Sequence, residues 1–181
     1  MSIHKKSFTI SGIVLKWRNF SETDRILTIL TKEMGKISCI AKGVRKINSK
    51  SRATLESGNF VKVFFIRTKG MPILTQSKLI NACSLARNNL GKIRRLTQFL
   101  EILDKLFVEE ELDSILFDQI ISIRSLILKE KCSAKELKNN LSDLIIKLGF
   151  QDPRLTKYNS ILDYVSSISQ LPMKSFEYLK V

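Results

Sequence analysis

The sequence predicts an α+β protein, in which a five-stranded β-barrel of the OB-fold type is followed by an all-α helical domain. Up to about residue 80, apolar residues alternate with polar ones in five short segments that are separated by turn residues, which is typical of strands. From residue 81 onward the apolar period changes to about 3.6 residues, which is typical of amphipathic helices. We therefore expect two domains, residues 1–80 and 81–181.

The five expected strands cover residues 7–16, 25–32, 36–42, 59–67 and 72–79. In the first of them the alternation slips by one residue at Gly12, which indicates a bulge or a sharp bend. The connection between the third and fourth strands is much longer than the others. Five strands with this long connection are the outline of an OB-fold, although an SH3-like barrel would give a similar pattern.

Apolar stripes at helical spacing occupy residues 96–107, 112–127 and 137–148, with a shorter one at 161–168 and a last helix expected from Pro172. Ser133 and Glu136 form a capping box before the third stripe, and Gly149 lies just past its end. Asp152 and Pro153 begin the next short segment. We expect the stripes to pack mainly against one another as the core of a small bundle.

The positive charge is concentrated in the first half of the chain. The whole sequence carries a net charge of +14, and residues 1–80 hold 16 lysines and arginines against 4 carboxylates, whereas residues 81–181 hold 15 against 13. Such an excess favours an anionic partner for the first half, with nucleic acid as the first candidate and an anionic membrane surface as the second.

The densest positive charge lies between Lys36 and Arg52, from the third expected strand into the connection that follows it. This stretch contains no carboxylate, and after the strand, glycine, asparagine and hydroxyl residues indicate a mobile loop with little role in the core. Lysines and arginines suit phosphate oxygens, and Ser49 and Ser51 offer neutral donors. The cations of the stretch are Lys36, Lys42, Arg45, Lys46, Lys50 and Arg52.

In an OB-fold the ligand lies across the second and third strands, between the one-two and four-five loops. Cations mixed with aromatic rings are expected in these loops: Lys16, Trp17, Arg18 and Phe20 in one, and Arg67 and Lys69 in the other. This mixture suits single-stranded nucleic acid, because bases stack on rings while charges follow the backbone. Alternatively, the two rings are core residues at the rim of the barrel, and an ion pair among Glu22, Asp24 and Arg25 fixes the first loop.

The sequence contains no catalytic constellation and no metal site. His4 is its only histidine, the four acids of the basic half do not cluster, and no glycine-rich phosphate loop is present. Cys39, Cys83 and Cys132 lack metal-binding spacing, so we expect buried thiols in a reducing compartment. Neither a signal peptide nor a membrane span is indicated, and we expect a cytoplasmic protein without a small-molecule substrate or cofactor.

Several segments together resemble a known family. They are residues 12–15 (GIVL), 20–27 (FSETDRIL), 30–38 (LTKEMGKIS) and 41–46 (AKGVRK), then Ser51-Arg52 and Leu55, and later Leu148-Gly149-Phe150 with Asp152-Pro153. In this order and spacing they closely resemble the bacterial recombination mediator family RecO, densely over the first 80 residues and sparsely beyond.

The resemblance implies an OB-fold followed by a helical domain, with no enzymatic activity. Family members bind single- and double-stranded DNA, anneal complementary strands, contact the tail of single-strand-binding protein, and with RecR help to load the recombinase RecA in the RecF pathway. By this resemblance, Lys42, Arg45 and Lys46 would bind DNA, together with Arg52.

The sequence departs from the family at two points. Many members carry a four-cysteine zinc site after the LGY segment, whereas here residues 154–157 read RLTK, so no zinc is expected. The chain is also shorter than usual at this end, which puts the surface for the single-strand-binding protein tail in doubt.

From these observations we expect a DNA-binding recombination and repair mediator. Two alternatives stay open, an RNA-binding OB module and a protein–protein adaptor that docks through its helical domain. The expected DNA-binding residues are Lys16, Trp17, Arg18, Lys36, Lys42, Arg45, Lys46, Lys50, Arg52, Arg67 and Lys69.

Overall fold

The computed structural model describes residues 7–84 and 89–175. The chain divides into two compact units, which are described separately. The first unit runs to Cys83 and also includes Phe107–Glu111, and the second contains the remaining residues. His4 and most of the last expected helix lie outside the described residues.

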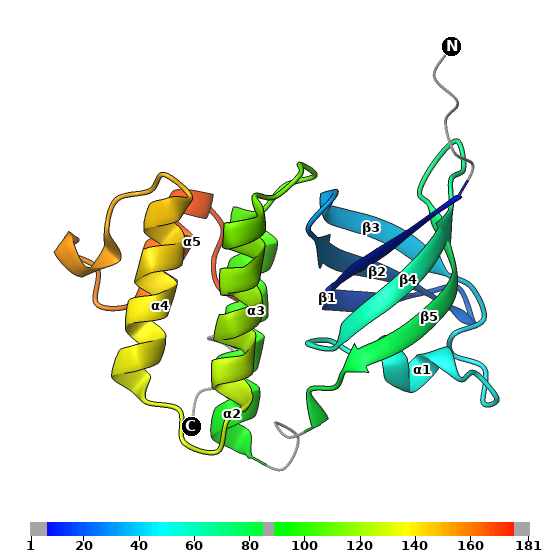
Figure 1. Cartoon of the computed structure of the whole chain (residues 1–181), viewed down its shortest axis with the longest axis horizontal. Coiled ribbons are helices and arrows are strands. Elements are labelled where there is room, and N and C mark those ends of the chain that lie inside the picture. The colour runs from blue at the N-terminus through cyan, green and yellow to red at the C-terminus, as the bar shows by residue number, and fades with distance from the viewer. Residues whose placement is uncertain (1–6, 85–88, 176–181) are drawn as a thin grey trace. The chain divides into compact units, whose positions relative to one another are not determined.

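The first unit is a closed five-stranded barrel with the strand order β1-β2-β3-β5-β4 (Figure 1). Neighbouring strands are antiparallel except for β3 and β5, which are parallel and share only two residue pairs. This topology, with a helix between β3 and β4, confirms the predicted OB-fold. The strands are β1 Ser7–Phe20, β2 Asp24–Thr31, β3 Gly35–Ala41, β4 Phe60–Ile66 and β5 Ile73–Asn81.

Four strands begin and end within two residues of the predicted positions, but β1 is longer. It continues through Trp17 to Phe20 and pairs with β2 along this extension, so the predicted loop shrinks to three residues. The bulge between β1 and β2 lies at Leu15 instead of the predicted Gly12. Gly12 is needed for another reason, because a Cβ there would overlap the backbone oxygen of Leu30 on the neighbouring strand.

The barrel core is filled by inward residues from all five strands, such as Leu27, Ile29 and Phe65, which are fully buried. Phe64 faces the other way from Phe65 and is half-buried, as expected for adjacent residues of a strand. The β3–β4 connection also contributes to this core, through Val44 and Leu55. The prediction that this connection has little role in the core was therefore wrong.

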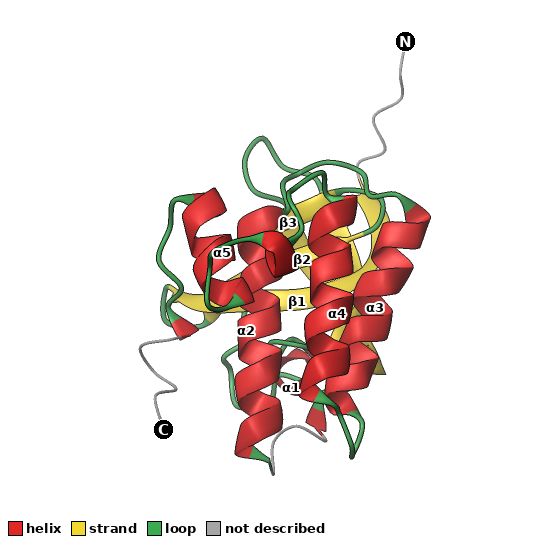
Figure 2. Ribbon diagram, turned by 90° about the vertical axis from the view of Figure 1, so that its left-hand side faces the viewer, coloured by secondary structure: helices red, strands yellow, loops and turns green. Residues whose placement is uncertain are grey.

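The second unit is helical, with α2 Leu90–Leu106, α3 Ser114–Leu128, α4 Ala134–Lys147, the short helix η2 Pro153–Leu155 and α5 Ile161–Ser169. In Figure 2, α2, α4 and α3 lie side by side, and α5 lies beside α2. Ser133 caps α4 by accepting from the Glu136 N–H, and Gly149 follows the helix with a φ of 87°. The start of α4 thus agrees with the predicted capping box, and its end agrees with the predicted stop before Gly149.

Phe107–Glu111 leaves the helical pattern that its apolar residues predict and joins the barrel unit. The Lys36 N–H at the start of β3 donates to the Val108 oxygen over 2.8 Å. Gly35 has a φ of 60°, and a Cβ on it would overlap backbone atoms of Val108 and Glu110. Because β5 pairs with β3 only at Ile40 and Ala41, this segment covers part of the otherwise open edge of β3.

Two of the three cysteines are buried, as predicted, whereas Cys132 is only half-buried. Burial raises the pKa of the Cys39 thiol to about 12, so this thiol stays protonated at neutral pH. Within residues 7–84 and 89–175 no group of three metal-ligating side chains comes together. No helix of the same residues combines the length and the hydropathy that a bilayer span requires.

Candidate nucleic-acid interface

The β3–β4 connection is held to the β1–β2 loop and to the first residue of β2 by three hydrogen bonds. The Gly43 N–H donates to the Asp24 carboxylate over 2.8 Å, the Arg45 N–H donates to the Thr23 oxygen, and the Arg45 guanidinium donates to the Ser21 oxygen, both over 2.9 Å. The bond from Gly43, followed by that from the Thr23 hydroxyl, holds the pKa of the Asp24 carboxyl below its usual value, so Asp24 is charged at neutral pH. The basic connection is therefore an ordered structure at this end of the barrel.

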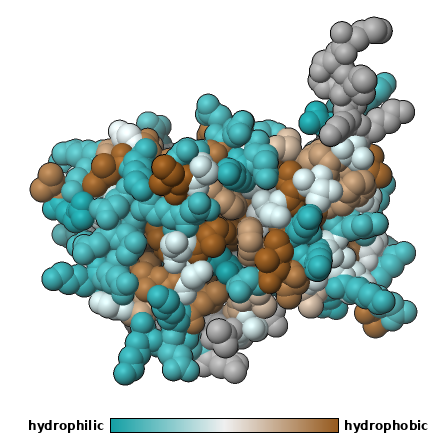
Figure 3. Space-filling view, viewed as in Figure 1, coloured by the Kyte–Doolittle hydropathy of each residue, from teal (hydrophilic) through white to brown (hydrophobic). Residues whose placement is uncertain are grey.

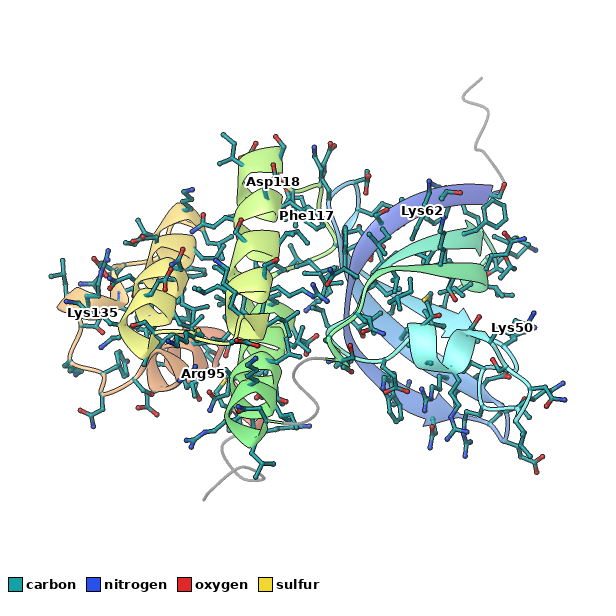
Figure 4. The ribbon with its side chains drawn as sticks, turned by 60° about the horizontal axis from the view of Figure 1, so that its bottom comes forward. Lys50, Lys62, Arg95, Phe117, Asp118 and Lys135 are labelled. Carbon is teal, nitrogen blue, oxygen red and sulfur yellow. The ribbon has the colours of Figure 1, made fainter. Side chains whose placement is uncertain are left out.

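We call Lys42, Arg45, Lys46, Lys50 and Arg52 the basic loop. Four of them are exposed and Arg45 is half-buried. Lys50 directly precedes α1, Ser51–Thr54, which lies below β5 in Figure 1, and Lys50 is labelled in Figure 4. None of the five forms an ion pair with a described residue. Apart from the Asp24 carboxylate, whose charge interacts with Lys42, no described carboxylate offsets these cations through an ion pair, and most of their charge faces solvent.

Lys36 does not belong to this group. It lies at the first end of β3, whereas Lys42 follows the last residue of that strand, about 20 Å away for seven residues of strand. Its backbone contacts Val108 on the far side of the barrel unit from the basic loop. The predicted run of six cations is thus continuous in sequence but split in space.

Lys16, Trp17 and Arg18 lie on β1 and not in a loop. Lys16 and Arg18 are exposed and share the outer face, next to Thr28 and Ile26 of β2. Trp17 points inward, where it packs on the barrel core. Cations on the outer face beside β2 and β3 suit the position at which an OB-fold holds its ligand.

One face of the Trp17 ring is already occupied by Arg25, whose guanidinium carbon lies 3.6 Å from the ring centroid. Arg25 is 5% exposed and forms an ion pair of 3.1 Å with Glu56, which follows the basic loop. The expected ion pair within the β1–β2 loop is therefore replaced by one between β2 and the β3–β4 connection. Trp17 acts as a rim residue of the core, the alternative that the sequence left open.

The β4–β5 loop brings Arg67 and Lys69 near the end of β3. Both side chains are exposed, and the Ile40 N–H donates to the Pro72 oxygen over 2.9 Å. Arg67 also lies over the Phe8 ring at 5.2 Å. The β4–β5 loop, the end of β3 and the start of the basic loop are therefore neighbours, although far apart in sequence.

The sequence analysis missed a pair of lysines on the barrel wall. Lys62 of β4, labelled in Figure 4, lies directly opposite Lys78 of β5, and both are exposed. Like charges at opposite positions destabilise a sheet, so such a pair favours an anionic ligand. Only the strand register, which sequence periodicity does not fix, places these residues together.

Although the net charge of the helical unit is small, its cations gather at one end, around the start of α2 and the α3–α4 loop. The Lys92 ammonium donates to the Leu128 oxygen and the Arg95 guanidinium to the Cys132 oxygen, so the start of α2 lies against the α3–α4 loop. Figure 4 labels Arg95 and Lys135 on α2 and α4. The cations at this end are Lys92, Arg94, Arg95, Lys129, Lys131, Lys135 and Lys138, against Glu130 and Glu136.

A pocket of about 250 Å³ opens between α2, α4 and α5. Its walls include Phe99, Leu137 and Leu141, and Arg95 and Lys138 also line it, whereas no described carboxylate does. Figure 3 shows apolar residues interspersed with hydrophilic ones on the visible face of the helical unit. Apolar walls with two cations suit an apolar ligand that carries negative charge.

Comparison with known proteins finds relatives of this chain. Residues 1–83 match the family model described as "Recombination protein O N terminal". The chain is 30% identical over 159 residues to a protein named DNA repair protein RecO from Clostridium acetobutylicum, a match that covers 88% of this chain and 62% of the relative.

Two further relatives carry the same name. The protein from Syntrophomonas wolfei is 26% identical over 139 residues, which are 77% of this chain and 56% of the relative. The protein from Streptomyces griseus is 43% identical over 79 residues, which are 40% of this chain and 32% of the relative. This chain thus spans about half the length of the curated relatives that it matches. The first 83 residues of this chain are therefore similar to the N-terminal domain of the RecO family of DNA repair and recombination proteins.

Proposed function

We propose that this protein is a cytoplasmic recombination mediator that binds single- and double-stranded DNA on its barrel, anneals complementary strands, and assists recombinase loading in the RecF pathway. The observation that carries the proposal is the basic loop, whose five cations lack ion pairs with described residues and are fastened beside the OB-fold ligand face. The similarity of residues 1–83 to the N-terminal domain of the RecO family supports it.

Charge neutralisation explains how such a protein acts without making or breaking bonds. Two complementary strands repel each other through their phosphates, and a surface that screens both sets of phosphates lowers the barrier to pairing. The basic loop, Lys16 and Arg18 on β1, and Arg67 and Lys69 in the β4–β5 loop supply such charge from three parts of the barrel. The Lys62 and Lys78 pair adds charge on β4 and β5.

Salt dependence tests the role of the basic loop. Five phosphate contacts on single-stranded DNA give a slope of log K against log salt of about −3 to −4, from about −0.7 per contact. Replacing Lys46 and Lys50 by alanine should flatten the slope by about 1 to 2 units. Arg45 is left intact, because its bond to the Ser21 oxygen also shapes the loop. The slope is measured by fluorescence anisotropy of a labelled oligonucleotide.

The matched control replaces Lys147 and Lys157, two exposed lysines of the helical unit, by alanine. Both variants lose two positive charges, so a general effect of net charge would flatten both slopes equally. An unchanged slope in the Lys46 and Lys50 variant would refute the assignment of the loop. Competition by RNA of the same sequence separates the RNA-binding alternative.

The pocket of the helical unit supports docking of the tail of single-strand-binding protein. Its apolar walls suit apolar side chains, and Arg95 and Lys138 suit carboxylates, so the docked tail is proposed to carry both. RecR is proposed as a further partner from the family resemblance, without an assigned surface.

Charge reversal at Lys138 tests this docking. Lys138→Glu should weaken binding of a synthetic tail peptide by about threefold to tenfold, because a rim charge then repels the peptide. Lys147→Glu, at the other end of the same helix and outside the pocket lining, is the control. Peptide binding is measured by isothermal titration. Equal weakening in both variants would show that overall charge, and not the pocket, attracts the peptide.

A further inference from the structure

Ile47 is the most exposed of the large apolar side chains in the described residues. It is 95% exposed, whereas the next most exposed, Leu90 and Leu155, are 78% exposed. Single exposed apolar residues are common on protein surfaces and by themselves need no explanation. Here the place of the residue matters, because Ile47 directly follows Lys46 in the middle of the basic loop.

The chain around Ile47 is ordered, so its exposure does not come from a lack of structure. The Lys46 N–H donates to the Gly43 oxygen over 3.2 Å, and the Ser49 N–H donates to the Lys46 oxygen over 3.0 Å. Three residues earlier, Val44 reaches the barrel core and is 2% exposed. The loop thus buries one apolar side chain and presents the other at its tip.

The neighbours of Ile47 restrict what it can contact. Arg45 and Lys46 precede it and Lys50 follows, and none of these forms an ion pair with a described residue. If these cations hold phosphates, the group between them meets the uncharged part of the polynucleotide, which is sugar and base. Apolar side chains that reach bases in this way insert at base steps and unstack them.

We propose that Ile47 is an apolar wedge that inserts against the bases of bound DNA and unstacks neighbouring bases. This inference rests on the proposed DNA-binding function and deepens it. An isoleucine side chain has no hydrogen-bonding group, so the wedge acts without regard to sequence. Unstacked bases turn their pairing edges outward, which favours pairing with a second strand.

The wedge and the cations have different signatures in binding data. Ile47→Ser should weaken the affinity for single-stranded DNA about tenfold, a loss in the range of one base contact. The slope of log K against log salt should stay unchanged, because Ile47 releases no counterion. Leu155→Ser, which replaces another highly exposed apolar residue in the helical unit, should change neither quantity.

Base unstacking gives an independent readout. An oligonucleotide with one 2-aminopurine fluoresces more strongly when that base is unstacked, so saturating wild-type protein should raise the signal. Ile47→Ser should lose most of this rise at saturation, and Ile47→Leu, which keeps an apolar side chain of equal size, should retain it. A circular dichroism spectrum of each variant checks that the barrel stays folded.

Three results would overturn the wedge. The first is wild-type affinity and wild-type 2-aminopurine signal in Ile47→Ser. The second is sedimentation with phosphatidylserine vesicles that Ile47→Ser abolishes while DNA binding is unchanged, since cations around an apolar tip also suit an anionic membrane. The third is absence of DNA binding by the wild type, which removes the proposed function as well. The first two results leave DNA binding by the basic loop standing.

Discussion

Glu56→Ala is expected to lower the free energy of unfolding by about 3 kcal/mol, the lower end of the range for breaking one side of a buried ion pair, because Glu56 is partly exposed. The loss leaves the Arg25 guanidinium, 5% exposed, without its carboxylate. Arg25 makes few other hydrogen bonds that could compensate, because its Nε atom already lacks a partner among the described residues. Contact with Trp17 compensates only part of the lost charge interaction.

Urea unfolding measures this effect directly, since Trp17 is the only tryptophan of the sequence and lies against Arg25. Glu56→Gln, which keeps an acceptor oxygen without the charge, should cost less than Glu56→Ala. The double variant Arg25→Met, Glu56→Leu should recover much of the loss, because it removes the buried charge itself. A loss below about 0.5 kcal/mol in Glu56→Ala, the usual range for surface substitutions, would contradict the structural role of the pair.

Gly35→Ala is expected to destabilise the barrel by about 3 kcal/mol or more. Two penalties add at this position. The φ of 60° lies in the left-handed region, which costs a residue with a Cβ about 1 kcal/mol or more. The Cβ would also overlap the backbone of Val108 and Glu110, and backbone atoms cannot move aside as a flexible side chain can.

Two other glycines of the same unit separate these penalties. Gly43 has a φ of 65° but only ordinary contacts around its added Cβ, so Gly43→Ala should cost about 1 kcal/mol. Gly70 has no atom within 4 Å of an added Cβ and no strained φ, so Gly70→Ala should change the stability by less than about 0.5 kcal/mol. Equal losses at Gly35 and Gly43 in urea unfolding would show that Phe107–Glu111 does not pack as described.

The strands and helices could be predicted because local periodicity determines them. The alternation of β2, β3 and β4 and the stripes of α2 to α5 are visible in the sequence, and Ser133 and Gly149 mark the ends of α4. The length of β1 was missed, since Trp17 to Phe20 are polar or aromatic and show no apolar alternation, although they pair with Asp24 to Leu27 of β2. Phe107 continues a helical stripe, so nothing local indicates that it leaves α2.

The candidate interface was predictable in part. A run of cations without acids is visible in the sequence, and it indicated the basic loop. Its attachment through Asp24, Thr23 and Ser21 depends on contacts between residues about 20 positions apart, which periodicity cannot show. The separation of Lys36 and the pairing of Lys62 with Lys78 follow from strand direction and register, which are tertiary properties.

The contribution of Phe107–Glu111 to the barrel has a practical consequence for expressing the barrel as a separate fragment. An expression fragment that stops after residue 83 keeps all five strands but leaves the Lys36 N–H without its Val108 acceptor and uncovers the adjoining strand edge. Such an edge invites pairing with other chains. The isolated barrel should therefore aggregate more readily than the full chain, and a synthetic peptide spanning residues 105–113 should restore its solubility.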